Sequence, residues 1–177
     1  MQLSGDLSQV SISSPRMILK SFTAADDEAF SEGNAAIARF MSWNPPASRE
    51  EFDRIREGLL ARIAAGDDLN LTVRLSSTGE FLGLAGLHSA DADLLETGLW
   101  IKQSAQRQGY GREAVAAVVA WASRRFRPSG LLWPVVDENL PSRRLAESLG
   151  GQIIGERRRQ KTGDIERTQL LYRIPVG

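Results

Sequence analysis

The sequence contains no cysteine, which excludes disulfide bridges, thiolate catalysis and cysteine-ligated zinc. Histidine occurs only once, and we expect no metal ion among the cofactors. No stretch approaches the roughly 18 consecutive apolar residues that a membrane span needs. The formal net charge is zero, whereas strong non-specific attraction to nucleic acid requires excess positive charge. We therefore expect neither a membrane nor a nucleic acid as a partner.

The chain has an ordinary globular composition, 42% hydrophobic and 25% charged, and its 177 residues predict one domain. Residues 1–13 are polar and rich in serine, and we expect them to form a flexible arm before a single domain at 14–177. The N-terminus has neither the basic segment nor the apolar run of a secretory signal. Together with the missing cysteine, this predicts a cytoplasmic protein.

Hydrophobic periodicity and turn residues predict elements in the order β-α-α-β-β-β-α-β-α-β-β. A helix between two strands implies a parallel pair and short turns imply antiparallel hairpins, so we expect a mixed α/β sheet with helices on its faces. The expected strands are 17–22, 69–75, 81–88, 94–101, 131–136, 152–159 and 166–174, with turns at 76–80, 91–93 and 162–163. The expected helices are 24–38, 49–66, 111–126 and 140–149.

Polar residues before these helices predict where they begin. Thr23 is expected to cap the first helix, with Asp26 three residues later where a carboxylate suits the helix dipole. Ser48 and Glu51 form a capping box for the second helix. Asn139 is the expected cap of the short helix near the C-terminus.

The most informative segment is 106–111, a glycine-containing turn between a strand and the longest amphipathic helix. Gly109 and Gly111 allow a sharp turn that exposes consecutive N–H groups, and the helix N-terminus adds partial positive charge. Arg107 and Arg112 could add charge-assisted hydrogen bonds. These features suit a diphosphate, although two glycines alone are equally typical of a plain loop before a helix.

The pattern Gln106-x-x-Gly109-x-Gly111 resembles the acyl-CoA pyrophosphate motif of the GNAT acetyltransferases. A buried strand that leads to Asn139 and is followed by Ser142 resembles the second motif of that family. Segments 14–19 and 40–46 are similar to the branch that includes the ribosomal-protein-alanine N-acetyltransferases. The resemblance extends from about residue 14 to residue 174.

The resemblance implies acetyl-CoA as co-substrate and a primary amine as acceptor, which attacks the thioester directly in a ternary complex. The acceptor is a peptide N-terminus or a small-molecule amine. The parallel strands 94–101 and 131–136 are expected to splay apart around CoA. Asn139 could bind CoA, cap its helix, or do both. The resemblance assigns CoA binding to Leu99, Trp100, Ile101, Arg107, Gln108, Gly109, Tyr110, Gly111, Arg112, Asn139 and Ser142.

Two residues are expected to transfer protons. Glu96 lies where many family members carry a catalytic base, acting directly or through water, and its alternative is a strand-end carboxylate in solvent. Many members protonate the leaving thiolate with a tyrosine, but Ala146 stands at that position here. Ser142 is the expected substitute donor, as in the ribosomal-protein branch, and its alternative is an ordinary residue of a helix first turn.

Other residues are candidates for the acceptor site. His88 could be a base or line the acceptor pocket, although a lone strand-end histidine is more often structural. Trp43 could shape the same pocket or serve as a hydrophobic anchor. Arg157 and its two arginine neighbours form an expected solvated edge, with an acidic acceptor or the CoA 3′-phosphate as the alternative contact.

Two rival functions fit parts of the sequence. Residues 109–114 match the Gly-x-Gly-x-x-Gly/Ala dinucleotide pattern, and Asp137 follows at about the right distance. Two observations argue against a dinucleotide-binding fold. The polar run 102–108 separates the glycines from their strand, whereas dinucleotide-binding glycines follow it directly, and hairpins precede the motif where further βαβ units are expected. The missing tyrosine leaves open a non-catalytic acyl-CoA-binding module. The sequence does not decide between a monomer and a homodimer.

Overall fold

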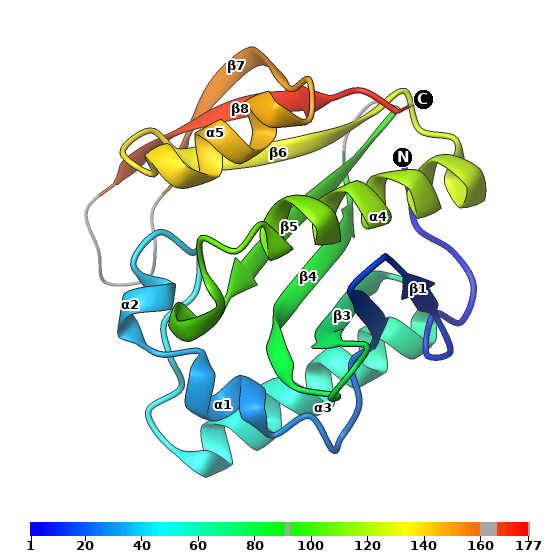
Figure 1. Cartoon of the computed structure of the whole chain (residues 1–177), viewed down its shortest axis with the longest axis vertical. Helices are drawn as coiled ribbons and strands as arrows, with labels where there is room; N and C mark the ends of the chain where they lie inside the picture. Colours follow the sequence, from blue (N-terminus) through cyan, green and yellow to red (C-terminus); the bar gives the residue numbers. More distant parts are fainter. Residues whose placement is uncertain (91–92, 160–165, 177) are drawn as a thin grey trace.

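A computed structural model describes residues 1–90, 93–159 and 166–176, which fold into one mixed sheet flanked by helices (Figure 1). The strand order in the sheet is β1-β2-β3-β4-β5-β6-β8-β7, and every neighbouring pair except β5–β6 is antiparallel. The strands are β1 (Ser11–Ser13), β2 (Met17–Ser21), β3 (Asp68–Leu75), β4 (Phe81–Ser89), β5 (Leu94–Ile101), β6 (Gly130–Val136), β7 (Gln152–Arg159) and β8 (Arg167–Ile174).

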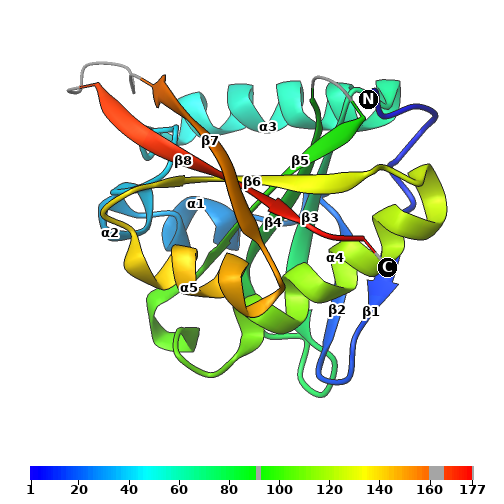
Figure 2. The same cartoon turned by 90° about the horizontal axis from the view of Figure 1, so that it is seen from above.

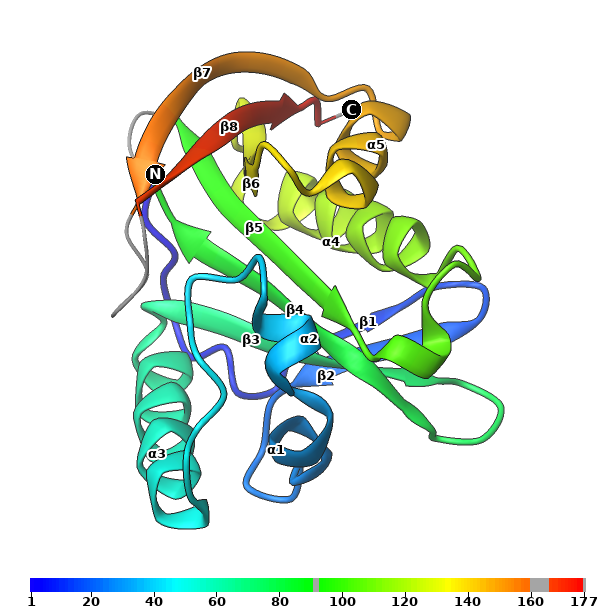
Figure 3. The same ribbon diagram turned by 90° about the vertical axis from the view of Figure 1, so that its left-hand side faces the viewer.

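Helices cover both faces of this sheet. In Figures 2 and 3, α3 lies on one face and α4 and α5 lie on the opposite face. The short helices α1 and α2 lie on the same side as α3 (Figure 3). The helices are α1 (Glu28–Glu32), α2 (Ala35–Ala38), α3 (Arg49–Ala65), α4 (Tyr110–Phe126) and α5 (Leu140–Ser148), with a 3₁₀ turn at Gln103–Ala105.

The splayed parallel pair predicted from the sequence is present. Strands β5 and β6 pair only from Leu94 opposite Gly130 to Glu96 opposite Leu132. Beyond Glu96, β5 continues along β4, whereas β6 turns away and pairs with β8. In Figure 1 the two strands start side by side and separate toward α2. The sheet therefore opens between them and leaves one edge of each strand unpaired.

Most predicted helix boundaries are confirmed. The Ser48 hydroxyl accepts a hydrogen bond from the Glu51 amide, and α3 ends at Gly66, whose φ of 77° is left-handed. The Asn139 side chain accepts from the Ser142 amide and caps α5. Helix α4 buries Ala114, Val115, Val118 and Ala122 against the sheet at the expected helical spacing.

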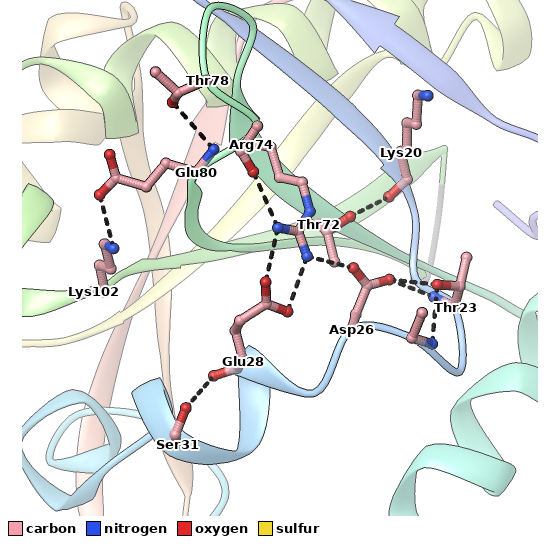
Figure 4. A network of polar contacts seen from close by, with 12 residues as sticks. Lys20, Thr23, Asp26, Glu28, Ser31, Thr72, Arg74, Thr78, Glu80 and Lys102 are labelled. Carbon is pink, nitrogen blue, oxygen red and sulfur yellow. Dashed lines mark hydrogen bonds and ion pairs between the residues drawn. The ribbon is translucent and has the colours of Figure 1, made fainter.

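The prediction of one continuous first helix over 24–38 is wrong, because the helix begins later and is interrupted. The segment forms two short helices separated by Gly33 and Asn34, and the Asn34 side chain caps the second. Thr23 does not cap a helix, because its amide and hydroxyl both donate to the Asp26 carboxylate. Arg74 also donates to Asp26, at 2.8 Å. This tertiary contact holds Asp26 in a turn before α1 (Figure 4).

The same arginine attaches α1 to the sheet. The Arg74 guanidinium contacts Glu28 at 3.0 Å and lies 5.4 Å from the centre of the Phe81 ring (Figure 4 shows the polar contacts). The hydrogen bond from Arg74 lowers the pKa of the Glu28 carboxyl below its ordinary value. Lys102 and Glu80 form a further ion pair at 2.9 Å on this side of the sheet. These contacts fix the position of α1, which forms one wall of the cleft described below.

Residues 1–13, predicted as a flexible arm, pack against the domain. Leu3, Leu7 and Ile12 are buried in the main core, and the Leu7 amide donates to the Ile63 carbonyl. Residues 11–13 form strand β1 beside β2. The three apolar residues have no regular spacing, so periodicity could not reveal that each one reaches the core.

Parts of the predicted turns lie outside the described residues, namely two positions of 91–93 and all of 162–163. Within the ranges that the structure describes, no helix is long and apolar enough to cross a membrane.

Candidate active site

A cleft of about 990 Å³ crosses the molecule at the opening between β5 and β6. On one face of the sheet it is bordered by α1, α2 and α3. On the other face it reaches the N-terminus of α4 and the first turns of α5. The cleft contains the predicted turn, Glu96, Ser142, His88 and Trp43. The fold thus brings together residues that the sequence analysis selected from five separate segments.

The turn before α4 has the backbone of an anion site. Gly109 is the N-cap of α4 with φ 82°, and Arg107 also has a left-handed φ of 62°. The first amides of a helix have no acceptor within the helix, so those of residues 110–112 are free to bind an anion. The Gln106 side chain donates to the Ile101 carbonyl at 2.9 Å and ties the turn to the end of β5. This hydrogen bond therefore fixes the turn before α4 relative to the unpaired edge of β5.

Arg16 supports this turn from outside. Its guanidinium contacts Glu113 at 2.7 Å and the Gln108 carbonyl at 3.1 Å, and it lies 4.5 Å from the centre of the Tyr110 ring. Glu113 also accepts from the Ser14 hydroxyl and the Arg16 amide. Burial opposes ionisation of Glu113, but these hydrogen bonds outweigh it and lower the pKa of its carboxyl. The network fixes the backbone of the turn against β2.

Close packing brings α4 near the unpaired edge of β5. A Cβ atom added to Gly111 would lie 3.1 Å from Leu99 and 3.2 Å from Leu145. Leu99 and Ile101 face α4, whereas Trp100 faces the opposite side of the sheet. The Trp100 ring packs against Phe81 and Trp43, with ring centres 5.8 Å and 6.3 Å away. This aromatic group closes the α2 end of the cleft.

Ser142 lies at the junction of β6 and α5. Its hydroxyl oxygen accepts a hydrogen bond from the Trp133 indole nitrogen at 3.0 Å, while its amide is held by Asn139. Because the oxygen already accepts, its own hydrogen is directed elsewhere and can be donated. Asn139 is therefore a helix cap here, and its contact with CoA stays a prediction. Arg112 donates to the Ser148 carbonyl at 3.3 Å and links α4 to α5.

Glu96 lies where β5 and β6 separate, and it is not free in solvent. Both of its oxygens accept from Arg157, at 3.1 Å and 3.3 Å, and Arg157 also donates to Gln169 at 2.8 Å. Arg157 was expected on a solvated edge, but this residue of β7, the edge strand beside β8, reaches the Glu96 carboxylate and lines the cleft. The catalytic role of Glu96 stays a prediction.

His88 lies opposite Glu96 in the antiparallel pairing of β4 and β5. Its Nδ1 is hydrogen-bonded to Asp68, the residue opposite it on β3. Asp68 also contacts Arg62 of α3, at 3.5 Å. Asp68, His88 and Glu96 thus form a row of charged and polar groups across three strands.

The comparisons with known proteins agree with this geometry. Residues 16–152 match the family described as "Acetyltransferase (GNAT) domain", which is more than half of the chain. The chain belongs to the GNAT acetyltransferase family. A search of curated proteins finds no match.

Solved GNAT structures have the same fold. A GCN5-related N-acetyltransferase from Brucella melitensis superposes with a TM-score of 0.80 at 19% identity, over 99% of this chain and 82% of the other. A GNAT-family acetyltransferase from Bacillus anthracis gives 0.80 at 19% identity, over 94% and 98%. The ribosomal L7/L12 alpha-N-protein acetyltransferase RimL, solved with coenzyme A, gives 0.79 at 16% identity, over 94% and 98%. The predicted fold is therefore confirmed.

Membership of the GNAT family makes the chain an acyltransferase, so the enzyme class expected from the sequence is confirmed. The dinucleotide-binding alternative is wrong, because β5–β6 is the single parallel pair in the described sheet and its strands splay apart. A Rossmann fold would need several adjacent parallel strands. Ala146, at the usual tyrosine position of GNAT enzymes, is fully buried in the core.

Sequence reasoning missed Asp68 and the pairing of Arg157 with Glu96. It also missed the glycine pair Gly86–Gly98, which lies beside His88 and Glu96. Each of these residues reaches the site through the register between neighbouring strands, and no local sequence pattern predicts that register. Among the described residues there is no cluster of three side chains that could hold a metal ion.

Proposed function

We propose that this GNAT protein transfers the acetyl group of acetyl-CoA to a primary amine within a ternary complex. The observation that carries the proposal is the continuous cleft through the sheet, with an anion-binding turn on one face and Glu96 and His88 on the other. Two substrates that enter from opposite faces would meet where β5 and β6 separate. Such positioning supplies most of the rate in a direct transfer.

The residues present fit CoA along this path. The free amides of 110–112 would bind its diphosphate, with Arg107 and Arg112 nearby. The unpaired edge of β5 at Leu99, Trp100 and Ile101 would pair with the amide groups of the pantetheine arm. The Gly98 position leaves open space beside this edge, because an added Cβ would meet no atom within 4 Å.

Ser142 would protonate the departing sulfur. Its hydroxyl accepts from Trp133, so its hydrogen is available, and it lies in the cleft at the start of α5. A hydroxyl in this place serves the purpose that a tyrosine serves in many family members. Positioned general acids contribute about 10²–10⁴-fold to rates.

Glu96 would hold the nitrogen of the acceptor beside the thioester. Its carboxylate keeps lone pairs after binding Arg157, and these can accept hydrogen bonds from the N–H groups of an amine. Trp43 and His88 would line the rest of the acceptor pocket. A peptide N-terminus and a small-molecule amine both fit this description, and the fold alone does not choose between them. We assign the enzyme to the cytoplasm on sequence composition alone.

Two measurements test the proposal. Isothermal titration of the wild-type protein with CoA should give one site per chain, and the Gly109→Val variant should lose most of this affinity. Thiol release from acetyl-CoA should then be measured across a panel of peptides and small amines. If CoA binds but no amine gives turnover, acetyl transfer is refuted while the binding site stands. If CoA does not bind at all, the whole proposal fails.

A further inference from the structure

We propose that His88, oriented by Asp68, is the base that takes the proton from the acceptor amine, while Glu96 stays paired with Arg157 as a fixed anion. This inference rests on the proposed acetyl transfer and names a further catalytic residue for it. It differs from the assignment predicted for Glu96 on family resemblance. Three features of the structure support it. They are the alignment of His88 with its neighbours on β3 and β5, the tautomer that Asp68 imposes, and the two glycines beside the imidazole.

The row places His88 at the reaction centre. Asp68, His88 and Glu96 are directly opposite one another on β3, β4 and β5, so their Cβ atoms point to the same face of the sheet. Residues paired in this way lie about 4.5–5.5 Å apart at Cβ. All three line the cleft on its acceptor face. An amine held by Glu96 is therefore next to the imidazole.

Asp68 selects the form of histidine that a base needs. Its carboxylate contacts Nδ1 of His88 and is itself only 14% exposed and held by Arg62. A carboxylate accepts hydrogen bonds, so Nδ1 carries the hydrogen and Nε2 of the neutral ring has a free lone pair. An aspartate that fixes a histidine in this tautomer is a recurrent arrangement for general bases.

Two glycines give Nε2 access to a substrate. An added Cβ on Gly86 would lie 2.5 Å from Nε2, so the ring covers the backbone of this residue. Gly86 lies opposite Gly98, where an added Cβ would meet no atom within 4 Å. The cleft floor beside Nε2 is therefore bare backbone with open space above it. A side chain at Gly86 would displace the imidazole.

Glu96 is less suited to accept the proton. Arg157 donates to both of its oxygens, so each oxygen is already engaged by a guanidinium N–H. The charged groups that face His88 are Asp68 of β3 with Arg62 of α3, and Glu96 of β5 with Arg157 of β7. Each carboxylate has its own arginine as a hydrogen-bond donor, so the lone pair of His88 Nε2 is left to accept the proton.

These residues account for every proton that moves in the reaction. The amine binds as the free base, and its nitrogen attacks the thioester carbon. As the C–N bond forms and the C–S bond breaks, Nε2 of His88 takes one proton from nitrogen and the sulfur takes one from Ser142. In the same step, water relays the proton of His88 to the Ser142 oxygen, so no serine alkoxide accumulates. The products are the amide and the free thiol, with no net proton released.

The kinetic test compares His88→Ala with wild type, using the best amine found in the panel. We expect kcat to fall about 100-fold with the KM for acetyl-CoA unchanged within about twofold. Added imidazole should restore part of kcat in His88→Ala and have no such effect on wild type. Asp68→Asn should lower kcat about tenfold, whereas Asp67→Asn, its neighbour on the exposed side, is the matched control and should keep wild-type kcat.

The tautomer can be observed without turnover, because His88 is the only histidine. Long-range ¹H–¹⁵N spectra of untagged, histidine-labelled protein should show a hydrogen on Nδ1 and none on Nε2 at pH 8. Hydrogen on Nε2 would overturn the proposal whatever the kinetics. Full kcat in folded His88→Ala, or loss of kcat that imidazole does not restore, would also overturn it. Absence of any wild-type turnover would instead refute the acetyl transfer on which the inference rests.

Discussion

The two ends of the cleft are built from different parts of the chain and by different means. In the proposed function the CoA end consists mainly of backbone, since the amides of one turn and the unpaired edge of one strand would provide its hydrogen bonds. Nearly all of it lies between residues 94 and 112, with support from Arg16 and Glu113. The acceptor end consists of side chains, with Asp68, His88 and Arg157 contributed by three different strands.

This difference explains what each end can recognise. A diphosphate is bound by any backbone that presents free amides with the right curvature, so a short glycine-containing segment is sufficient. An acceptor amine needs a base, a charge and a shaped floor, and these come from residues that only the sheet register brings together. We therefore expect substitutions at the CoA end to change affinity and substitutions at the acceptor end to change kcat.

Ser142, where the two ends meet, gives the largest expected effect after His88. Ser142→Ala should lower kcat about 100-fold and leave CoA affinity nearly unchanged, because the hydroxyl acts on the departing sulfur. Steady-state kinetics and calorimetry measure the two quantities. Ser148→Ala is the matched control, since that hydroxyl lies on the same helix and donates to the Leu145 carbonyl. Equal effects of the two substitutions would show that Ser142 only stabilises α5.

Gly109→Val tests the CoA end alone. A β-branched residue at a φ of 82° is strained by about 1–3 kcal/mol, and the turn should relax to a shape that no longer presents its amides. We expect CoA affinity to fall about 30-fold in calorimetry. Gly79→Val is the control, because Gly79 has a φ of 76° in a turn away from the cleft. If both variants bind CoA equally well, the turn is not the diphosphate site.

Arg16→Ala should have a smaller effect of the same kind. Without Arg16 the turn loses its contacts with Glu113 and the Gln108 carbonyl, and we expect the KM for acetyl-CoA to rise about fivefold at constant kcat. Arg49→Ala is a fair control, because both arginine side chains are 46% exposed and both pair with carboxylates. A change in kcat instead of KM would place Arg16 outside the CoA end.

Glu113→Gln gives the smallest effect, and it depends on pH. The pKa of Glu113 is lower in the folded state than its ordinary value, so the ionised carboxylate stabilises the fold above about pH 4.5. This contribution is lost as the pH falls through the lowered pKa. We expect urea denaturation to show a loss of about 1 kcal/mol for the variant at pH 7 and a smaller loss at pH 3. An equal difference at both pH values would contradict the ionic origin.

The sequence predicted the local structure at the proposed CoA end, but not the contacts between side chains at the proposed acceptor end. The segment 106–111, the strands around it and the Asn139 cap are local features, and local patterns are sufficient to find them. Glu96, His88 and Trp43 were selected one by one, without their partners. The partners depend on how β3, β4 and β7 align, and a shift of one residue in that register would turn each side chain to the other face.

The same division applies to the whole molecule. Composition, periodicity and capping residues by themselves determined a mixed sheet, a long central helix and a turn suited to a diphosphate, because each depends on neighbours within a few residues. Only the tertiary structure decided that residues 1–13 join the core, that Arg74 holds Asp26 out of a helix and that Arg157 pairs with Glu96. Those outcomes depend on contacts between residues far apart in the chain, whose energies no local segment contains.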